Sequence, residues 1–451
     1  MSLPILTAVT DAVVEAGLVS AFDRTDLGVT VVRRCVDLPD LLAAATTGAA
    51  RAALLSADLR RLDREALARL ALANVAVVGL IAPGDEAADR RLRQLGVVAV
   101  ITTDAMADEV AGAVVEAAKA LTGRPAIGPV SFGRGLSDPI AGYGTRLPPL
   151  LGDPALGDTV AGRDESDQAP VEAGRVVAVW GPTGAPGRTT LALGLAAELA
   201  DLGAATLLVD ADSYGGSIGQ LVGLLEEAPG LAAATRAANQ GMLDLPRLAV
   251  LCRDLGGGLR VLPGIARPSR WPELRPSALE NVLDLAKRLA QFVIVDCGFC
   301  LEADEELSYD TSAPRRNGAT HAVLAAADTV IAVSSAEPVA LVRFVRGLAD
   351  LRELVPGVEP LVVVNRLRAS VAGGDPRREI SRALNRHTGT EPVALVPYDL
   401  AAFDAAQAAG QLLRDIAPAS PARAAIRDLA TRLTGRVPRG QRQRRRLNAR
   451  R

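Results

Sequence analysis

The sequence contains little lysine and few aromatic residues. Only Lys119 and Lys287 are lysines among 50 basic residues, and 52 acidic residues give a formal net charge of −2. This balance gives no general reason to expect a nucleic acid or an anionic membrane as partner. Aromatic residues make up 3% of the chain and hydrophobic residues 49%, so we expect aliphatic cores, and 451 residues leave room for two or three domains.

Cysteine, histidine and long apolar runs are also scarce. Four cysteines, with no secretory signal at the N-terminus, predict a reducing cytoplasm rather than a disulfide framework. No apolar run reaches the roughly 18 residues that a membrane-spanning helix needs, so we expect no transmembrane segment. Cys297 and Cys300 form a lone CxxC pair. We interpret these two cysteines as small residues that follow a buried strand rather than as a metal or redox site. His321 and His387 have no third partner at catalytic or metal spacing.

Residues 1–121 alternate short aliphatic segments with amphipathic ones, which predicts five βα units and a doubly wound parallel sheet. The predicted strands are Ile5–Val9, Val29–Val36, Ala52–Ser56, Val75–Ile81 and Val97–Thr102.

This first domain resembles a response-regulator receiver domain, but in a degenerate form. A working receiver has a phosphate-accepting aspartate at the end of its third strand, whereas here that strand ends in Ser56 and Asp58 is displaced into the loop. The fifth strand leads into Thr102, Thr103 and Asp104 instead of a lysine. We therefore expect that Asp58 does not accept phosphate.

Residues 122–174 are rich in Gly, Pro, Asp and Ser and predict a flexible linker. A second α/β domain is predicted for 175–434, so the fold class is α/β with two doubly wound domains, the second with a mostly parallel sheet.

An arginine-rich tail, 435–451, ends the sequence without an acidic residue; its arginines are Arg436, Arg439, Arg442, Arg444, Arg445, Arg446, Arg450 and Arg451. These side chains can contact phosphates of nucleic acid or anionic lipid. Val437 and Leu447 are its only large aliphatic residues, which does not support an amphipathic membrane helix. We expect at most weak, sequence-independent binding.

Residues 181–190 read Gly-Pro-Thr-Gly-Ala-Pro-Gly-Arg-Thr-Thr, between the apolar strand Val176–Trp180 and an apolar helix that opens at Thr189. Such a strand, glycine-rich loop and helix form a phosphate-binding loop, because consecutive backbone N–H groups point into an anion-sized hollow at the helix N-terminus. Thr189 supplies a hydroxyl for Mg²⁺, and Arg188 replaces the expected lysine. The predicted ligand-binding residues of the loop are Gly184, Ala185, Pro186, Gly187, Arg188, Thr189 and Thr190.

Polar residues follow three further apolar segments of the second domain. Ala205–Asp212 ends in the carboxylates Asp210 and Asp212, and Phe292–Asp296 ends in Asp296. Carboxylates at the carboxyl end of a strand are suited to binding a metal ion and water. The strand Pro360–Val364 leads into Asn365 and Arg366; strands are also predicted at Thr329–Ser334 and before Tyr398.

This ordered set is similar to that of the ParA/MinD group of deviant Walker ATPases. The receiver-like domain narrows the resemblance to CpaE/TadZ-like pilus-assembly and septum-site-determining proteins. The resemblance implies that ATP and Mg²⁺ bind, with ATP preferred over GTP. The resemblance implies that Arg188 and Asp212 are catalytic, with Asp212 positioning the attacking water. It also implies that Thr189, Asp210 and Asp296 bind the metal ion. Asn365 would recognise adenine, and Arg366 follows it as in the family's common Asn-Arg pair.

Two residues depart from the family pattern. The family has a lysine where this chain has Thr183, and that lysine crosses an ATP-sandwiched dimer; a second lysine stands where this chain has Arg188. Arginine for lysine is not conservative at a close-fitting site. Removing a transition-state charge costs on the order of 10²-fold or more in rate. We therefore expect an ATPase with weak turnover, in which binding survives better than hydrolysis.

The implied function is an ATP-dependent homodimer switch that positions a pilus, secretion or cell-division assembly, in the cytoplasm with recruitment to the pole, septum or inner membrane face. Three alternatives stay open: a nucleotide-bound scaffold that never hydrolyses, a chromosome or plasmid partitioning ATPase, and a metabolic P-loop enzyme or iron–sulfur reductase.

Overall fold

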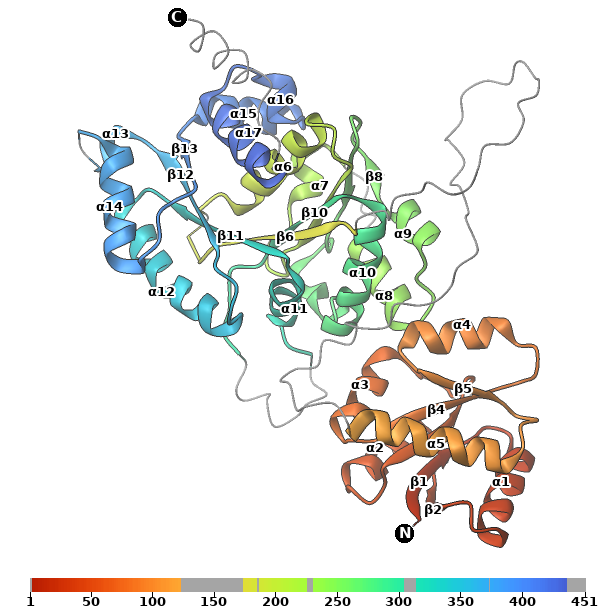
Figure 1. Cartoon of the computed structure of the whole chain (residues 1–451). Helices are drawn as coiled ribbons and strands as arrows, with labels where there is room; N and C mark the ends of the chain where they lie inside the picture. Colours follow the sequence, from red (N-terminus) through yellow and green to blue (C-terminus); the bar gives the residue numbers. More distant parts are fainter. Residues whose placement is uncertain are drawn as a thin grey trace, which may run out of the picture.

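The computed structural model describes residues 2–122, 173–184, 186–224, 230–303, 314–372 and 374–435. It consists of two α/β units, coloured red to orange and yellow to blue in Figure 1. The predicted linker and the arginine-rich tail, except at their ends, and Ala185 lie outside the described residues.

The first unit contains a parallel sheet of five strands in the order β2-β1-β3-β4-β5, which is the flavodoxin-like order of a doubly wound fold. Each of its first four helices begins after an aspartate whose carboxylate accepts a backbone N–H bond, namely Asp11, Asp37, Asp63 and Asp85. The elements are β1 (Leu3–Ala8), α1 (Ala12–Arg24), β2 (Val29–Arg34), α2 (Leu38–Thr46), β3 (Ala52–Ser56), α3 (Arg64–Leu72), β4 (Ala76–Ile81), α4 (Glu86–Leu95), β5 (Ala99–Thr102) and α5 (Ala107–Thr122).

The second unit contains a sheet of eight strands in the order β13-β12-β11-β6-β10-β7-β9-β8. Among these described strands only β8 and β9 pair antiparallel, so the predicted α/β class with a mostly parallel sheet is confirmed. The elements are β6 (Arg175–Trp180), α6 (Arg188–Asp201), β7 (Thr206–Ala211), α7 (Ile218–Leu221), α8 (Gly230–Asn239), α9 (Leu245–Leu251), β8 (Arg253–Asp254), β9 (Leu259–Leu262), η1 (Pro268–Glu273), α10 (Pro276–Leu289), β10 (Phe292–Cys297), α11 (Gly318–Ala326), β11 (Thr329–Ser335), α12 (Pro338–Leu354), β12 (Leu361–Leu367), α13 (Ala369–Ala372), α14 (Pro376–Thr388), β13 (Ala394–Pro397), α15 (Leu400–Ala409), α16 (Leu413–Ile416) and α17 (Pro421–Leu433).

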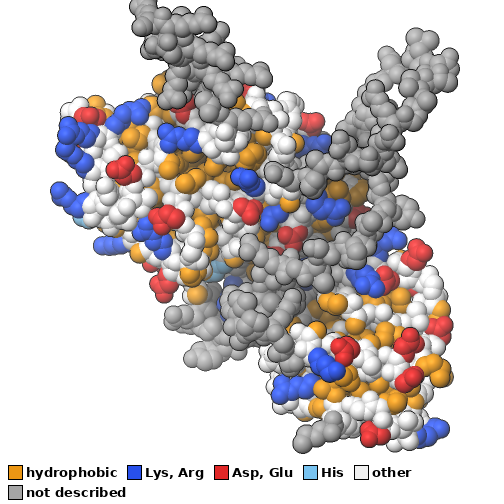
Figure 2. Space-filling view, viewed as in Figure 1, with side chains coloured by type: hydrophobic (Ala, Val, Ile, Leu, Met, Phe, Trp, Pro, Cys, Tyr) orange, Lys and Arg blue, Asp and Glu red, His pale blue; other side chains and the backbone are white. Residues whose placement is uncertain are grey.

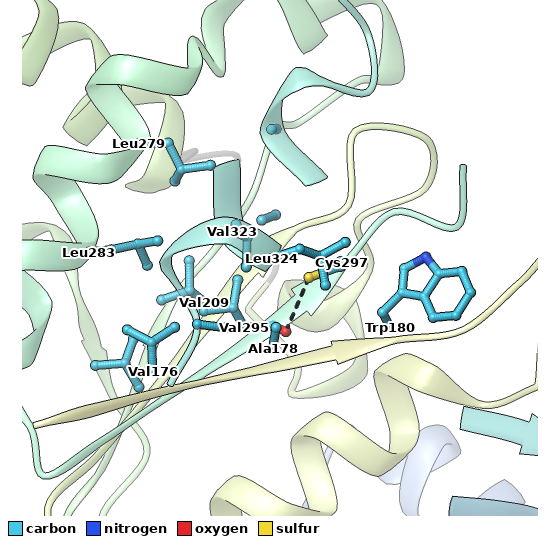
Figure 3. Close-up of a cluster of buried hydrophobic side chains, with 14 of the residues drawn as sticks. Val176, Ala178, Trp180, Val209, Leu279, Leu283, Val295, Cys297, Val323 and Leu324 are labelled. Atoms are coloured by element: carbon cyan, nitrogen blue, oxygen red, sulfur yellow. Dashed lines mark hydrogen bonds between the residues drawn. The ribbon is translucent and has the colours of Figure 1, made fainter. Parts of the chain in front are cut away.

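Both faces of this sheet are buried, which explains why its strands are continuous apolar runs. In β6, Val176, Ala178 and Trp180 point into the core cluster shown in part in Figure 3, which also takes in α8, α10, α11 and α12. Val177 and Val179 point to the opposite face, into the cluster that contains α6 and α17. The two-residue period of a strand distributes one apolar run over two cores.

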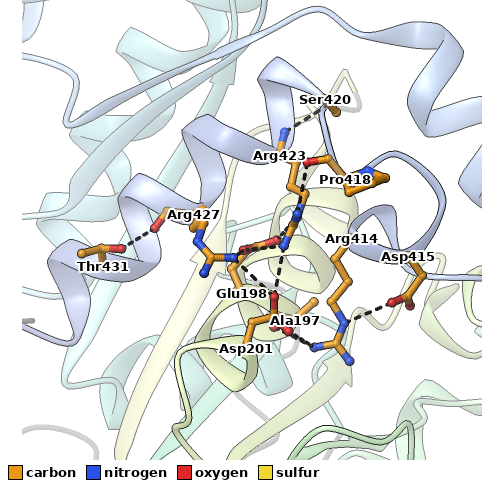
Figure 4. Close-up of polar contacts among 10 residues, drawn as sticks. All are labelled: Ala197, Glu198, Asp201, Arg414, Asp415, Pro418, Ser420, Arg423, Arg427 and Thr431. Atoms are coloured by element: carbon orange, nitrogen blue, oxygen red, sulfur yellow. Dashed lines mark hydrogen bonds and ion pairs between the residues drawn. The ribbon is translucent and has the colours of Figure 1, made fainter. Parts of the chain in front are cut away.

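The helix α17 is fixed to α6 by charged side chains (Figure 4). Glu198, only 2% exposed, lies 2.6 Å from the Nε of Arg423 and 3.2 Å from an Nη of Arg427. Asp201 on the same helix pairs with both of these arginines and with Arg414. Because breaking a buried pair leaves an uncompensated charge, the contact holds α17 in one position on α6.

The first unit contacts the second through α3 and α4, which lie against α8 and α10. Burial raises the pKa of Glu280 on α10 to about 7; nearby Arg64 on α3 lowers it, and Asp284 raises it further. Burial also lowers the pKa of Arg64. The polar contacts are Asn239 Nδ2 to Asp63 Oδ2 at 3.0 Å, Arg91 Nε to the Gln240 carbonyl at 3.2 Å, and an ion pair between Arg275 and Glu65.

The face seen in Figure 2 mixes hydrophobic side chains with charged ones of both signs, and Lys and Arg side chains gather over α14, which carries Arg377, Arg378, Arg382 and Arg386. In the described part of the chain, no helix has the length and apolar character needed to cross a bilayer.

Candidate functional site

The loop between β6 and α6 is shaped by three glycines. Gly184 and Gly187 have φ angles of 109° and 91°, which side chains other than glycine rarely adopt. A Cβ built on Gly181 would lie 2.4 Å from the carbonyl oxygen of Val333 on β11. The loop therefore turns tightly at the carboxyl edge of the sheet and leads into the N-terminus of α6, an arrangement suited to binding an anion.

Arg188 is directed at the loop itself and at an aspartate. Its Nη1 donates to the carbonyl oxygens of Gly181 and Pro182 at 2.9 Å and 3.3 Å. Its Nη2 lies 3.6 Å from Oδ2 of Asp212, and its Cζ lies 5.9 Å from the centre of the Phe299 ring. The Nε of Arg188 is buried and has no hydrogen-bond partner among the described residues. One N–H of the guanidinium thus stays available to an acceptor.

Asp296 is a buried carboxylate that is poorly hydrogen-bonded within the described part of the chain. It is 0% exposed, and neither oxygen has a well-formed hydrogen bond within the described ranges. Burial raises its pKa well above the usual value, and so does Asp210, its register partner on β7; the Thr189 hydroxyl and Arg188 act in the opposite direction. Orphaned buried carboxylate oxygens are rare in native proteins and call for a ligand or a water.

Asp210 and Asp212 are the other two carboxylates at this edge. Asp210 accepts the backbone N–H groups of Ile218 and Asp212 at 3.1 Å and 3.3 Å, and burial raises its pKa to about 6. Asp212 accepts the N–H of Tyr214 at 2.8 Å through Oδ1, while Oδ2 faces Arg188. Of the three predicted carboxylates, Asp296 therefore has the most free lone pairs.

The two threonines of the loop differ in their contacts. Thr190 donates its hydroxyl to the carbonyl oxygen of Gly187 at 2.9 Å, which closes the first turn of α6. Thr189 is half-buried, and its hydroxyl is near enough to Asp296 to lower that carboxyl's pKa. Thr189 and Asp296 are thus brought together, as a metal-binding pair requires.

Asn365 lies against the loop. Its Nδ2 donates to the carbonyl oxygen of Pro186 at 3.0 Å, and a Cβ on Gly187 would lie 2.3 Å from the same Nδ2. Its Oδ1 accepts the backbone N–H of Arg366 at 2.8 Å, and Arg366 has a φ of 56°. In this structure the amide of Asn365 fixes the loop between β6 and α6, a contact that the sequence does not reveal.

A small polar wall, also absent from the sequence prediction, closes one side of the site. The Tyr214 ring lies 4.6 Å from the Phe299 ring, and the guanidinium of Arg316 lies 4.1 Å from the centre of the Tyr214 ring. The Tyr214 hydroxyl donates to Asn317 Oδ1 at 2.8 Å, and Asn317 donates to Cys300 Sγ at 3.3 Å. The only signal in the sequence is that these residues follow the acidic strand ends or precede an apolar helix.

In the first unit, the residues around Asp58 are occupied with one another. Thr10 donates its hydroxyl to Asp58 at 2.6 Å and its backbone N–H to the Ser56 hydroxyl at 3.1 Å. Asp11 caps α1 by accepting the N–H groups of Val13 and Val14. These contacts do not test phosphate transfer to Asp58, so its inertness stays a prediction.

Cys297 and His321 are both hydrogen-bonded to backbone carbonyl groups. Cys297 is fully buried in the core of Figure 3 and donates to the Val295 carbonyl at 3.7 Å, and burial raises its pKa well above the usual value. His321 is hydrogen-bonded to the Leu301 carbonyl at 3.0 Å, and burial lowers its pKa. Among the described residues, no group of three or more His, Cys, Asp or Glu side chains is placed to hold a metal ion.

Over somewhat more than half of its length, the chain is similar in structure to ParA- and MinD-type ATPases. A ParA family ATPase from Chlorobium tepidum TLS matches with 19% identity over 57% of this chain and 99% of that one, at a TM-score of 0.47. The cell division ATPase MinD of Pyrococcus furiosus matches with 20% identity over 58% and 99%, at 0.46. The Pyrococcus horikoshii OT3 septum site-determining protein MinD, complexed with Mg-ADP, matches with 18% identity over 57% and 95%, at 0.43.

Relatives in sequence are uncharacterized proteins from two strains of Mycobacterium tuberculosis, each 33% identical over 189 residues. The match covers 42% of this chain and 45% of each relative, so it spans less than half of their length. No protein-family model matches the chain.

Proposed function

We propose that the second unit is a ParA/MinD-type ATPase that binds ATP with Mg²⁺ and acts as a spatial regulator. The observation that carries this proposal is Asp296, a fully buried carboxylate whose two oxygens have no well-formed hydrogen bond among the described residues, next to a glycine-shaped loop at a helix N-terminus. A divalent cation and a phosphate chain satisfy both features at once, because the cation needs oxygen ligands and the phosphates need N–H donors.

The donor set fits this ligand. Backbone N–H groups of the loop and of the first turn of α6 would hold the phosphates, and Thr189 and Asp296 would hold Mg²⁺, the latter through water. Bound Mg²⁺ would supply a Lewis acid that neutralises charge on the terminal phosphates. Asp212 would orient water, because its Oδ1 is fixed by backbone N–H bonds and its Oδ2 faces the site and Arg188.

The contacts of Arg188 support the proposal that ATP hydrolysis is slow. Its guanidinium contacts the loop carbonyls and Asp212, so a phosphate must compete with these partners for it. Thr183 carries no charge. Both features also support the second candidate, a scaffold that binds ATP and does not hydrolyse it.

The finer function is a proposal from the sequence resemblance: an ATP-dependent homodimer that positions a pilus, secretion or septum assembly through protein partners. Recognition of adenine by Asn365 belongs to the same proposal. Since its amide holds the Pro186 carbonyl, Asn365 would contact a base only by exchanging or sharing that hydrogen bond.

Binding and turnover separate these candidates. We expect calorimetric titration to show Mg²⁺-dependent ATP binding that EDTA abolishes and that GTP matches only poorly. Phosphate release should be slow and should fall on the order of 10²-fold in Asp212→Ala. Asp350→Ala, an exposed aspartate on α12, is the matched control.

Each outcome has a meaning. No Mg²⁺-dependent ATP binding by the intact chain overturns the proposed function. If ATP binds but no phosphate release that depends on Asp212 is detected, the result favours the second candidate, the scaffold that does not hydrolyse ATP. Light scattering with and without Mg-ATP tests the dimer, and a mass that does not change with nucleotide would contradict the dimer switch.

A further inference from the structure

Arg343, on the helix α12, lies against the phosphate loop. A Cβ built on Gly184 would lie 2.8 Å from an Nη atom of Arg343. The guanidinium thus occupies the space directly beside the loop backbone, next to the residue where the related ATPases carry a lysine and this chain has Thr183. Any role of Arg343 toward a ligand rests on the proposed function, namely that this loop binds ATP.

The packing of α12 explains this position. Its preceding strand, β11, pairs in parallel with β6, so α12 and the loop leave the sheet at the same edge. At Gly347 the helix packs closely on the base of the loop, since a Cβ there would lie 3.0 Å from the Trp180 ring and 3.5 Å from Pro182. Arg343 is four residues earlier, on the same helix face and one turn nearer the helix N-terminus. Phe344, 0% exposed, anchors that turn in the core.

Within the described part of the chain, the charge of Arg343 is not engaged elsewhere. The side chain belongs to an exposed residue, and among the described residues it forms no ion pair and no hydrogen bond. Arg188, by contrast, faces Asp212 with a side chain that is 11% exposed. The loop therefore has one arginine directed inward at a carboxylate and a second one beside its outer backbone, free to bind an anion.

We propose that Arg343 binds the terminal phosphate of the nucleotide held by its own chain, beside a stretch of the loop where Thr183 carries no charge. An arginine suits this task because its planar fork donates two parallel hydrogen bonds to phosphate oxygens. Its exposed side chain needs no rearrangement of the core to reach a ligand on the loop. The preference for a triphosphate over a diphosphate is the direct consequence, because the third phosphate adds the charge that Arg343 binds.

The test compares nucleotide affinities of the full chain by calorimetry, with Mg²⁺ and either the non-hydrolysable analogue AMP-PNP or ADP. Arg343→Ala should weaken AMP-PNP binding about 10-fold, the effect of losing one charge-assisted hydrogen-bonded contact, and ADP binding by much less. Arg346→Ala, the next exposed arginine on α12, is the matched control and should bind both nucleotides like the wild type.

A charge-keeping variant tests whether the cation at position 343 matters. Arg343→Lys should bind AMP-PNP more tightly than Arg343→Ala, because it keeps a positive charge at the same place although it loses the planar fork. Equal affinities of Arg343→Ala and Arg346→Ala overturn the inference while leaving the proposed ATP site intact, and so does an Arg343→Lys variant that binds AMP-PNP no better than Arg343→Ala. If the wild type binds neither nucleotide, the proposed function fails and this inference fails with it.

Discussion

The buried carboxylate of Asp296 leads to a prediction about stability. Asp296→Asn keeps the shape of the side chain and removes a charge that is fully buried, lacks a well-formed hydrogen bond among the described residues and is adjacent to Asp210. An unsatisfied buried polar group costs about 1–3 kcal/mol and a charged one costs more, so we take the extra cost of the carboxylate over the amide of Asn as about 1–3 kcal/mol. At about 2–4 °C per kcal/mol for a domain of this size, the nucleotide-free variant should melt about 2–12 °C above the wild type at pH 8.

The gain should depend on pH in a defined direction. Burial raises the folded-state pKa of Asp296, so the wild type loses stability as pH rises from the ordinary carboxyl pKa through the raised one. Asp210, with a pKa raised to about 6, also makes the protein less stable as pH rises, and this contribution is present in both the wild type and Asp296→Asn. The advantage of Asp296→Asn should therefore be small near pH 4 and largest at pH 8.

Thermal melts followed by circular dichroism at both pH values provide the measurement, with Asp350→Asn on the exposed face of α12 as control. Mg-AMP-PNP at 100 times its dissociation constant should stabilise the wild type by about 2.7 kcal/mol and should stabilise Asp296→Asn far less. A variant that melts below the wild type at pH 8 without nucleotide would refute the reasoning, because the carboxylate would then contribute stability rather than cost it.

Three further predictions concern packing and pH. Glu198→Ala should cost about 1–3 kcal/mol in urea unfolding, because Arg423 and Arg427 lose one carboxylate partner and keep Asp201, and a loss below about 0.5 kcal/mol would contradict that role. Gly181→Ala should lower both the melting temperature and ATP affinity, since its Cβ would meet the Val333 carbonyl at 2.4 Å; an unchanged melt would show that the loop relaxes freely. Glu280, with a pKa raised to about 7, should make the chain less stable as pH rises from about 4.5 to 7, and Glu280→Gln should flatten the dependence of the urea midpoint on pH.

The sequence predicts the strands of the second unit well because that sheet is buried on both faces. Each strand is then a continuous apolar run, and the polar residue that ends it is easily seen, as at Asp296. The two-residue strand β8 (Arg253–Asp254) and the four-residue strand β9 (Leu259–Leu262) are not among the predicted strands, because neither is a long apolar run.

Contacts between distant segments could not be predicted in the same way. The hydrogen bond from Asn365 to Pro186 joins residues 179 apart and depends on how β12 lies against the loop. Arg343 gives no signal, because one exposed arginine on an amphipathic helix is ordinary in a chain with 50 basic residues. Its significance comes only from the packing of Gly347 on Trp180, which no local pattern encodes.

The ion pair between Glu198 and Arg423 also bears on how the protein is made. The two residues are 225 positions apart, and Glu198 lies in the helix that begins at the phosphate loop. At a synthesis rate of about 5–20 residues per second, α6 leaves the ribosome roughly 10–45 s before its arginine partner exists. During that interval Glu198 has no arginine partner from α17, so burial of its carboxylate against the sheet is disfavoured. The packing of α6, the helix that begins at the candidate ligand-binding loop, is therefore favoured most strongly once α17 has been made.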